Sequence, residues 1–165
     1  MSMQLNRRII TESPQDLLIQ YGSEITQDPR FLALKDRVHH YNSNLYDHCV
    51  AVTLCALEVA KDLQIKVDPG SLVRGCLLHD YFLYDCHAKG HPWFHMTRHG
   101  MMAAQNAMRD FGINPVEADM IANHMWPLHP FRFPLCIEGW ILTLADKKVS
   151  VKERFTKKKK TVLDQ

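Results

Sequence analysis

Apolar residues recur with a helical period along most of this chain. From Asn44 to Leu63 they return every three or four positions, which places them on one face of a helix. The same spacing predicts a helix that begins at Asp68-Pro69 and another that begins near Thr97 and ends at Gly112. No segment shows the strict alternation that is typical of a half-buried strand. The pattern therefore predicts an all-α fold, a single-domain helical bundle.

Capping residues followed by proline mark where other helices begin. Ser13-Pro14, Asp28-Pro29 and Asn114-Pro115 each offer an N-cap side chain with proline at the first helical position. The helix after Asn114 is expected to reach His124, and a last helix is expected to run from about Leu135 to Val151. The segments between helices are predicted to be loops or broken helix, at residues 39–44, 81–96 and 126–134.

Six side chains that can bind metal lie within or at the ends of five predicted helices. They are His48, His79, Asp80, His99, His124 and Asp146. A single inward-facing histidine is most often a hydrogen-bonded core residue, so the argument depends on the joint pattern. Burying this many ionisable groups without a cation would be costly, whereas neutral imidazoles and carboxylates form the inner shell of a divalent ion. The set predicts a metal site in the helical core.

The order His, His-Asp, His, His, Asp on a helical chain resembles the HD-domain superfamily of metal-dependent phosphohydrolases. The resemblance covers about residues 44–150. In that superfamily four residues bind one metal, and here they would be His48, His79, Asp80 and Asp146. Members with two metals add two histidines, for which this sequence offers His99 and His124, and Asp80 would then bridge the ions. The resemblance thus implies two divalent ions per chain, and the mixed His/Asp shell suits the transition metals Fe, Mn, Zn, Co or Ni.

The resemblance also implies a reaction class. It predicts hydrolysis of a phosphate monoester or diester by metal-activated water, on a small phosphorylated substrate such as a nucleotide. Asp80 would hold both ions, and Lys147, directly after the ligand Asp146, would bind a phosphate oxygen. A solvated lysine on a helix face is the alternative for Lys147.

Sequence motifs of subgroups within the superfamily limit which substrates are expected. Residues 77–85 and 124–128 resemble a group of small bacterial HD proteins with no substrate that we can name. Cyclic-dinucleotide phosphodiesterases of the superfamily carry Ile-Gly-Lys after His-Asp and a Gly-Tyr-Pro motif. In this chain Tyr81-Phe82-Leu83 follows His-Asp instead of Ile-Gly-Lys, and Gly-Tyr-Pro is absent. Cyclic di-GMP is therefore not the expected substrate.

Two other functions remain open from the sequence. Some members of the superfamily use the same six ligands to hold two irons and activate dioxygen. A metal-stabilised binding module without enzymatic activity is the third option, although a degenerate module would be expected to have lost ligands.

The remaining candidates rank lower. His95 would share a helix face with His99 only if their helix began before Thr97. For the other candidates ordinary surface or core roles are at least as common. His87 and His91 would donate to a leaving group, and His129 would line the cavity. A phosphate oxygen would be bound by Lys89, Arg98, Arg132 or Lys148, and a nucleobase would stack on Trp93, Phe94, Trp126 or Phe131.

Length and composition fit one globular domain. The chain has 165 residues, of which 46% are hydrophobic. We expect N-terminal helices at 1–43, an HD-type core at 44–151 and a basic tail at 152–165. No apolar run approaches the length that crosses a bilayer, and the five cysteines form no C-x-x-C pair, which favours reduced thiols and a cytoplasmic location.

The net charge of +2 is unevenly distributed. Residues 147–165 carry eight Lys and Arg against Glu153 and Asp164, a net charge of +6, so residues 1–146 carry −4. The basic end is expected to be a solvated, frayed tail that contains Lys157 to Lys160. No aromatic residues interleave with these lysines, so nucleic acid is not an expected partner. Nothing in the sequence indicates the oligomeric state.

Overall fold

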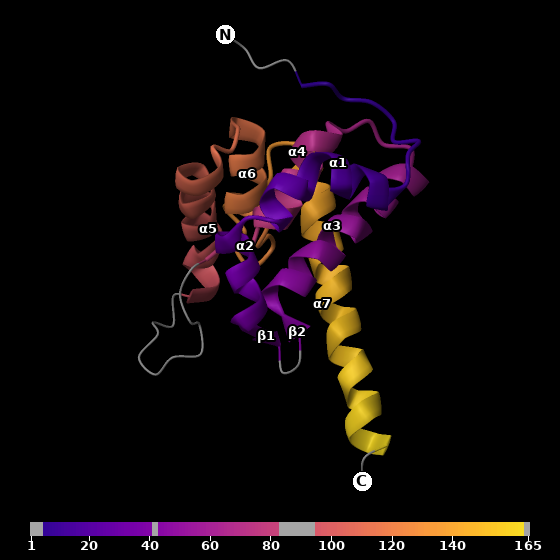
Figure 1. Ribbon diagram of the computed structural model, residues 1–165, viewed down its shortest axis with the longest axis vertical. Helices are drawn as coiled ribbons and strands as arrows, with labels where there is room; N and C mark the ends of the chain where they lie inside the picture. The colour runs from indigo at the N-terminus through magenta and orange to yellow at the C-terminus, as the bar shows by residue number, and fades with distance from the viewer. Residues whose placement is uncertain (1–4, 41–42, 83–94, 164–165) are drawn as a thin grey trace.

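Helices account for most of the residues that the computed structural model describes, which are 5–40, 43–82 and 95–163 (Figure 1). The helices are α1 (Pro14–Thr26), α2 (Pro29–Leu32), α3 (Leu45–Asp62), α4 (Pro69–Leu78), α5 (His95–Phe111), α6 (Pro115–Asn123) and α7 (Ile137–Leu163), with a 3-10 turn, η1, at Ala33–Asp36. The predicted all-α class is confirmed.

The helices begin and end where the sequence provides local signals. A side-chain oxygen accepts a first-turn backbone N–H at the N-caps of α1, α2, α3, α4 and α6, which are Ser13, Asp28, Asn44, Asp68 and Asn114. At α6 this becomes a capping box, because Glu117 accepts the Asn114 N–H in return. Gly112 follows α5 with φ +58°, a left-handed conformation that glycine adopts without strain.

α4 lies at the centre of the bundle. It contacts α1, α3, α5, α6 and α7, while α3 also packs along α7 and α5 pairs with α6. The α4 residues Leu72, Val73, Cys76 and Leu77 are fully buried. Full burial of a leucine or valine side chain such as these stabilises the fold by about 1.5–3 kcal/mol. This packing carries the C-terminal end of α4, where His79 and Asp80 follow, into the interior.

Polar contacts connect the N-terminal segment to the bundle. Arg8 and Val67 form an antiparallel bridge, and Arg7 donates to both oxygens of Glu138 at 2.8 and 2.9 Å. The Glu138 carboxylate is fully buried and also accepts the Asp68 N–H at 3.0 Å. Burial raises the pKa of Glu138, but these hydrogen bonds outweigh it and hold the pKa below its ordinary value. The segment is therefore fixed by a charged pair to the start of α7.

A small hairpin replaces part of the loop predicted at residues 39–44. β1 (Val38–His40) pairs antiparallel with β2 (Ser43–Asn44), directly before α3. The prediction of a loop was wrong to this extent. Strands of two and three residues are too short for an alternating pattern to show in the sequence.

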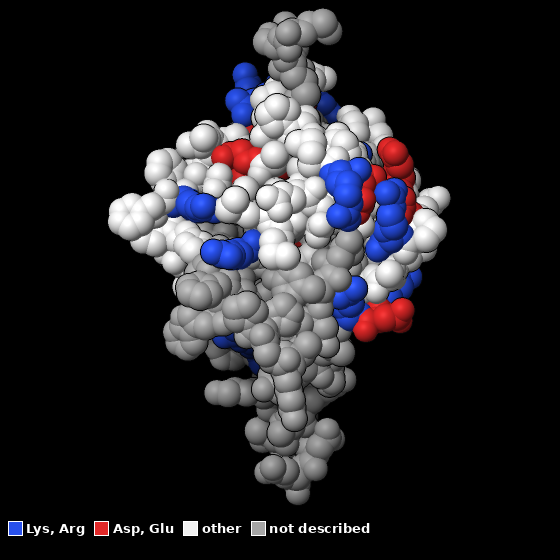
Figure 2. Space-filling view, turned by 90° about the vertical axis from the view of Figure 1, so that its left-hand side faces the viewer, with Lys and Arg blue, Asp and Glu red and all other residues white. Residues whose placement is uncertain are grey.

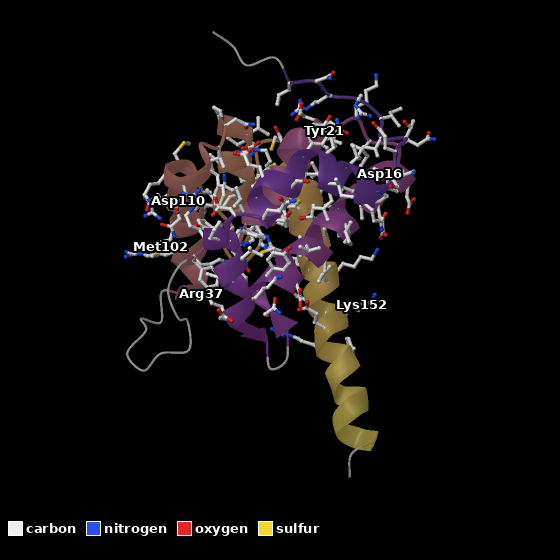
Figure 3. All side chains as sticks on the ribbon, in the orientation of Figure 1. Asp16, Tyr21, Arg37, Met102, Asp110 and Lys152 are labelled. Atoms are coloured by element: carbon white, nitrogen blue, oxygen red, sulfur yellow. The ribbon has the colours of Figure 1, made fainter. Side chains whose placement is uncertain are left out.

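Two helices are longer than predicted. α5 begins at His95 rather than near Thr97, and α7 continues to Leu163 rather than ending at Val151. Residues 152–163 contain neither Gly nor Pro and are rich in Lys and Arg, which are good helix formers, so no residue stops the helix. The tail expected to be frayed is helical to Leu163. In Figure 1 this part of α7 projects beyond the bundle, and Lys152, labelled in Figure 3, lies where it does so.

Figure 2 shows the side of the molecule that carries α5 and α6. In the part that the structure describes, uncharged side chains cover most of this face and charged ones of both signs gather on one flank. The exposed apolar residues of α5 include Met101, Met102 and Met108, and Met102 points away from the bundle in Figure 3. None of the described helices is apolar over a stretch long enough to span a membrane.

The described cysteines are free thiols, as predicted. Cys49, Cys55 and Cys76 are buried and Cys136 is partly buried. Burial raises the pKa of each of these thiols, so they stay protonated and act as small apolar residues. Cys86 lies outside the described residues.

Candidate metal centre

His79 lies in the interior at the end of α4, with one ring nitrogen held by the helix. Its Nδ1–H donates to the carbonyl oxygen of Cys76 at 2.8 Å, one of the carbonyls that a helix end leaves unpaired. Because a carbonyl only accepts, this bond places the proton on Nδ1 and the lone pair on Nε2. Nε2 is buried and has no hydrogen-bond partner among the described residues. A nitrogen in this state fits a cation.

His124 repeats this arrangement at the end of α6. Its Nδ1–H donates to the Ile121 carbonyl at 2.7 Å, so its Nε2 also carries a lone pair. Burial, together with electrostatic interaction with the His79 and His99 rings, lowers the pKa of His124 to about 4 and keeps the ring neutral. Thr143 of α7 donates to the carbonyl of His124 at 3.2 Å and anchors the end of α6.

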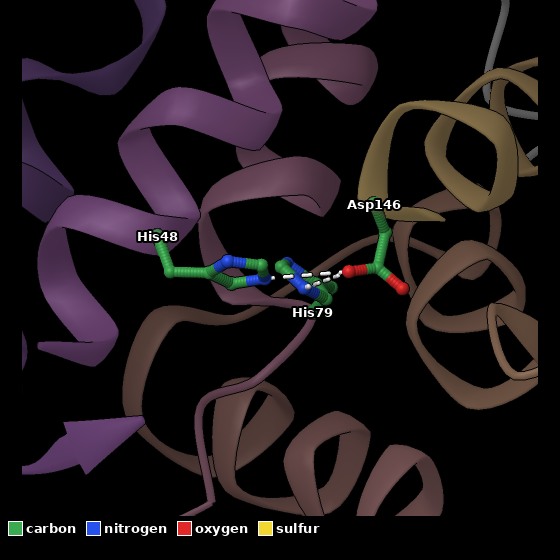
Figure 4. A group of neighbouring side chains, drawn as sticks. All are labelled: His48, His79 and Asp146. Carbon is green, nitrogen blue, oxygen red and sulfur yellow. Dashed lines mark ion pairs between the residues drawn. The ribbon is translucent and has the colours of Figure 1, made fainter. Parts of the chain in front are cut away.

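One group of ligand atoms comes from α3, the end of α4 and α7 (Figure 4). The Asp146 oxygen Oδ1 lies 3.3 Å from His48 Nε2 and 3.9 Å from His79 Nε2. Ligand atoms about 2.1 Å from an ion at tetrahedral angles lie roughly 3.4 Å apart. These distances therefore fit one ion among the three residues, whose ligand atoms all lie within 4.8 Å of one another.

Asp80 connects this group to a second one. Its Oδ2 lies 3.6 Å from His79 Nε2, whereas its Oδ1 lies 3.5 Å from His99 Nε2 and 3.6 Å from His124 Nε2. The Nε2 atoms of His99 and His124 are 3.1 Å apart. The two carboxylate oxygens thus face two sets of imidazole nitrogens, which is the position that a bridging ligand requires.

Close packing of α5 on the end of α6 brings His99 and His124 together. A Cβ atom at Gly100 would lie 2.9 Å from the Ile121 carbonyl oxygen and 3.1 Å from that of Ala122. A larger residue would push the two helices apart, so the glycine after His99 is a local requirement for this contact. The His99 ring also meets the edge of Phe82, with centroids 5.8 Å apart.

Carboxylates on both sides of His48 hold a proton on its ring when no cation is present. Burial lowers the pKa of His48, but hydrogen bonds with Asp146 and Glu153 outweigh it and raise the pKa to about 10. Burial raises the pKa of Asp146, yet the bond with His48, helped by electrostatic interaction with the His79 and His124 rings, holds it well below its ordinary value. The metal-free site therefore contains an ion pair between His48 and Asp146 at neutral pH.

Metal binding should consequently release about one proton from His48 at pH 8, because a metal ligand must be a neutral imidazole. The pKa of about 10 in the folded protein lies above the ordinary value of 6.5. The His48 proton therefore stabilises the metal-free fold fully below about pH 6.5, and this contribution is lost as the pH rises toward about 10. Calorimetric titration with Zn²⁺ in two buffers of different ionisation enthalpy counts the protons. Binding without proton release by the wild-type protein would contradict the assignment, and His48→Gln should remove this release.

The structure brings all six predicted ligand residues together, and their role as metal ligands remains a prediction. Trp126 packs edge-on against Trp140 of α7 with centroids 5.0 Å apart, whereas Phe131 is almost fully exposed. His129 is partly buried and Arg132 is exposed beside Met101. His95 is the first residue of α5, but its side chain is outside the described ones. Several candidates lie outside the described residues altogether: His87, Lys89, His91, Trp93 and Phe94.

Glu153 is a contact of this site that was not predicted. Both of its carboxylate oxygens lie 3.3 Å from His48 Nδ1. Glu153 follows Asp146 by seven residues, two helical turns, so both side chains lie on the same face of α7. This spacing would have indicated Glu153 if the predicted helix had not ended at Val151.

Comparison with known proteins agrees with this arrangement. The model of the HD domain family matches residues 45–149, well over half of the chain, from the first residue of α3 into α7. No curated protein and no solved structure matches the chain. All six residues of the cluster fall inside the matched stretch, and the helical fold is the one expected. The chain therefore belongs to the HD domain family, as the order of its histidines and aspartates predicted.

Proposed function

We propose that this protein hydrolyses phosphate esters, with divalent transition-metal ions held by the His/Asp cluster. The observation that carries the proposal is the Asp80 carboxylate, which turns one oxygen to His79 and the other to His99 and His124. A bridging carboxylate between two sets of nitrogen ligands suits a two-metal hydrolytic site. Membership of the HD family supports the reaction class, and the buried groups able to hold an ion support the cofactor.

The chain's own residues divide between two positions. The first would be held by His48, His79, Asp80 and Asp146, and the second by Asp80, His99 and His124. Ions bound there would act as Lewis acids and lower the pKa of a coordinated water to roughly 7. The carbonyl bonds of His79 and His124 already aim their Nε2 lone pairs into the cluster, so binding needs no ring rotation. Burial of these groups keeps bulk water away and strengthens their charge interactions.

Lys147 is proposed to bind an oxygen of the substrate phosphate. It follows Asp146 on α7, is partly buried, and donates to the His124 carbonyl at 3.4 Å. Burial lowers the pKa of Lys147, an effect that the nearby Asp146 carboxylate opposes. An ammonium group beside the metal ligands would attract a phosphorylated substrate. We expect this substrate to be small, with nucleotides among the candidates.

Mn²⁺-loaded protein should hydrolyse p-nitrophenyl or bis-p-nitrophenyl phosphate equally well in anaerobic and in aerated buffer. A hydrolase needs a Lewis acid and no oxidant. His79→Ala should remove the activity, because His79 contacts both the Asp146 and Asp80 carboxylates. Activity that requires iron and air, with oxygen uptake, would instead show a di-iron oxygenase. A metal-replete protein that hydrolyses neither these esters nor a nucleotide panel would favour a binding module.

The neighbouring lysines provide a matched control for the same assay. Lys147→Ala should raise KM by about 10- to 100-fold, the equivalent of one charged hydrogen bond worth about 1.5–3 kcal/mol. Lys148→Ala should leave KM unchanged, because the Lys148 side chain is exposed. Equal KM values for the two variants would contradict the role of Lys147.

A further inference from the structure

We propose that Glu153 is a positioning residue that holds the His48 ring in the orientation and tautomer needed for metal binding. The proposal rests on the metal site of the proposed function. It adds to that site a residue beyond position 149, where the match to the HD family ends.

α7 contacts both ring nitrogens of His48. Asp146 lies 3.3 Å from Nε2, and the two oxygens of Glu153 each lie 3.3 Å from Nδ1. The His48 side chain is fully buried, and the Glu153 side chain is 19% exposed. An ionised carboxylate only accepts hydrogen bonds. When His48 gives up one proton to bind a metal, Glu153 would therefore retain the other on Nδ1 and leave the Nε2 lone pair for the cation.

The position of His48 in its helix explains why it uses a carboxylate. His79 and His124 lie at the C-terminal ends of α4 and α6, where unpaired carbonyls accept their Nδ1–H groups. His48 lies in the first turn of α3, where the helix leaves N–H groups unpaired instead of carbonyls. The acceptor must therefore come from another element, and α7 supplies it.

A charged acceptor has a further effect on the ligand. A carboxylate that accepts the Nδ1–H of a ligand histidine raises the basicity of Nε2, and loss of such a partner typically costs about 10- to 100-fold in metal affinity. Glu153 lies beyond residue 149, where the family match ends. The part of α7 that continues past the match would therefore contribute directly to the first metal position.

Two measurements on the Zn²⁺-loaded, full-length protein test this role. Competition with a chelator gives the Zn²⁺ affinity, and ¹H–¹⁵N NMR detects the Nδ1–H of His48, identified by its absence in His48→Gln. Glu153→Ala should lower the affinity for one ion by close to 100-fold and lose the Nδ1–H signal to exchange with water. Glu153→Gln retains a neutral acceptor, so it should lose about tenfold and keep the signal. Glu58→Gln, an exposed glutamate on α3, is the control and should change neither.

The outcomes separate this proposal from the metal site itself. A wild-type protein that binds no Zn²⁺ would refute the site and the proposed function together. Tight wild-type binding that Glu153→Ala leaves unchanged, or a protected Nδ1–H in that variant, would refute the positioning role alone. If circular dichroism shows that Glu153→Ala does not fold, Glu153→Gln decides, and an affinity equal to that of the wild type overturns the proposal.

Discussion

Asp80→Ala is expected to remove phosphoesterase activity and to lower the metal content from about two ions per chain to one or fewer. Asp80 is the residue whose oxygens face both groups of nitrogens, so its loss weakens both positions at once. The Lewis-acid contribution of bound ions is several kcal/mol, so we expect kcat/KM to fall by at least about 10³-fold. Elemental analysis and an ester hydrolysis assay on the same preparation check this.

Two other variants test whether the weakening of both positions is specific to Asp80. His99→Ala should empty mainly the second position and retain about one ion, because His99 contacts Asp80 and His124 but lies in the second group. Asp62→Ala removes an exposed carboxylate at the end of α3 and should leave metal content and activity unchanged. An Asp80→Ala protein that still holds about two ions would show that Asp80 does not bridge.

Removing the metal is expected to lower the melting temperature by on the order of 10 °C. Ions bound only by the folded state stabilise it by about 4 kcal/mol at a free concentration 1,000 times the dissociation constant. For a chain of this size each kcal/mol shifts the melting temperature by about 2–4 °C. Calorimetry or circular dichroism of chelator-treated protein, with and without added Mn²⁺ or Zn²⁺, measures the shift.

The specificity of this stabilisation is part of the test. His79→Ala should remove most of the gain, because His79 contributes to the first group and contacts the Asp80 bridge. Mg²⁺ should stabilise less than Mn²⁺ or Zn²⁺, since it prefers an all-oxygen shell. Metal-free protein with full thermal stability, and no gain from any of these ions, would argue against the site.

Local signals were sufficient to predict most of the helices. The caps at Ser13, Asp28, Asn114 and the glycine at Gly112 act within a few residues, so their effect is written in the nearby sequence. The ends without such signals were the ones placed wrongly, at the start of α5 and the end of α7. The hairpin before α3 was missed because pairing between such short strands leaves no periodicity.

The six residues of the cluster could be found from the sequence because their types and order can be read from the chain directly and their helical context follows from local spacing. Their number and burial made a cation the simplest way to offset the cost of removing so many polar groups from water. The family match covers all of them, in agreement with the resemblance based on the same residues.

The arrangement of the site is decided by tertiary packing. The division of the Asp80 oxygens between two groups depends on how α4, α5 and α6 meet, including the close contact at Gly100. The pairing of His48 with Glu153 joins residues 105 positions apart and depends on α3 lying along α7. Sequence by itself determined the six candidate ligands and the helices on which they lie, because caps and periodicity act over a few residues. Which groups face one another was decided only when the helices packed, because distances between their side chains depend on contacts far apart in the chain.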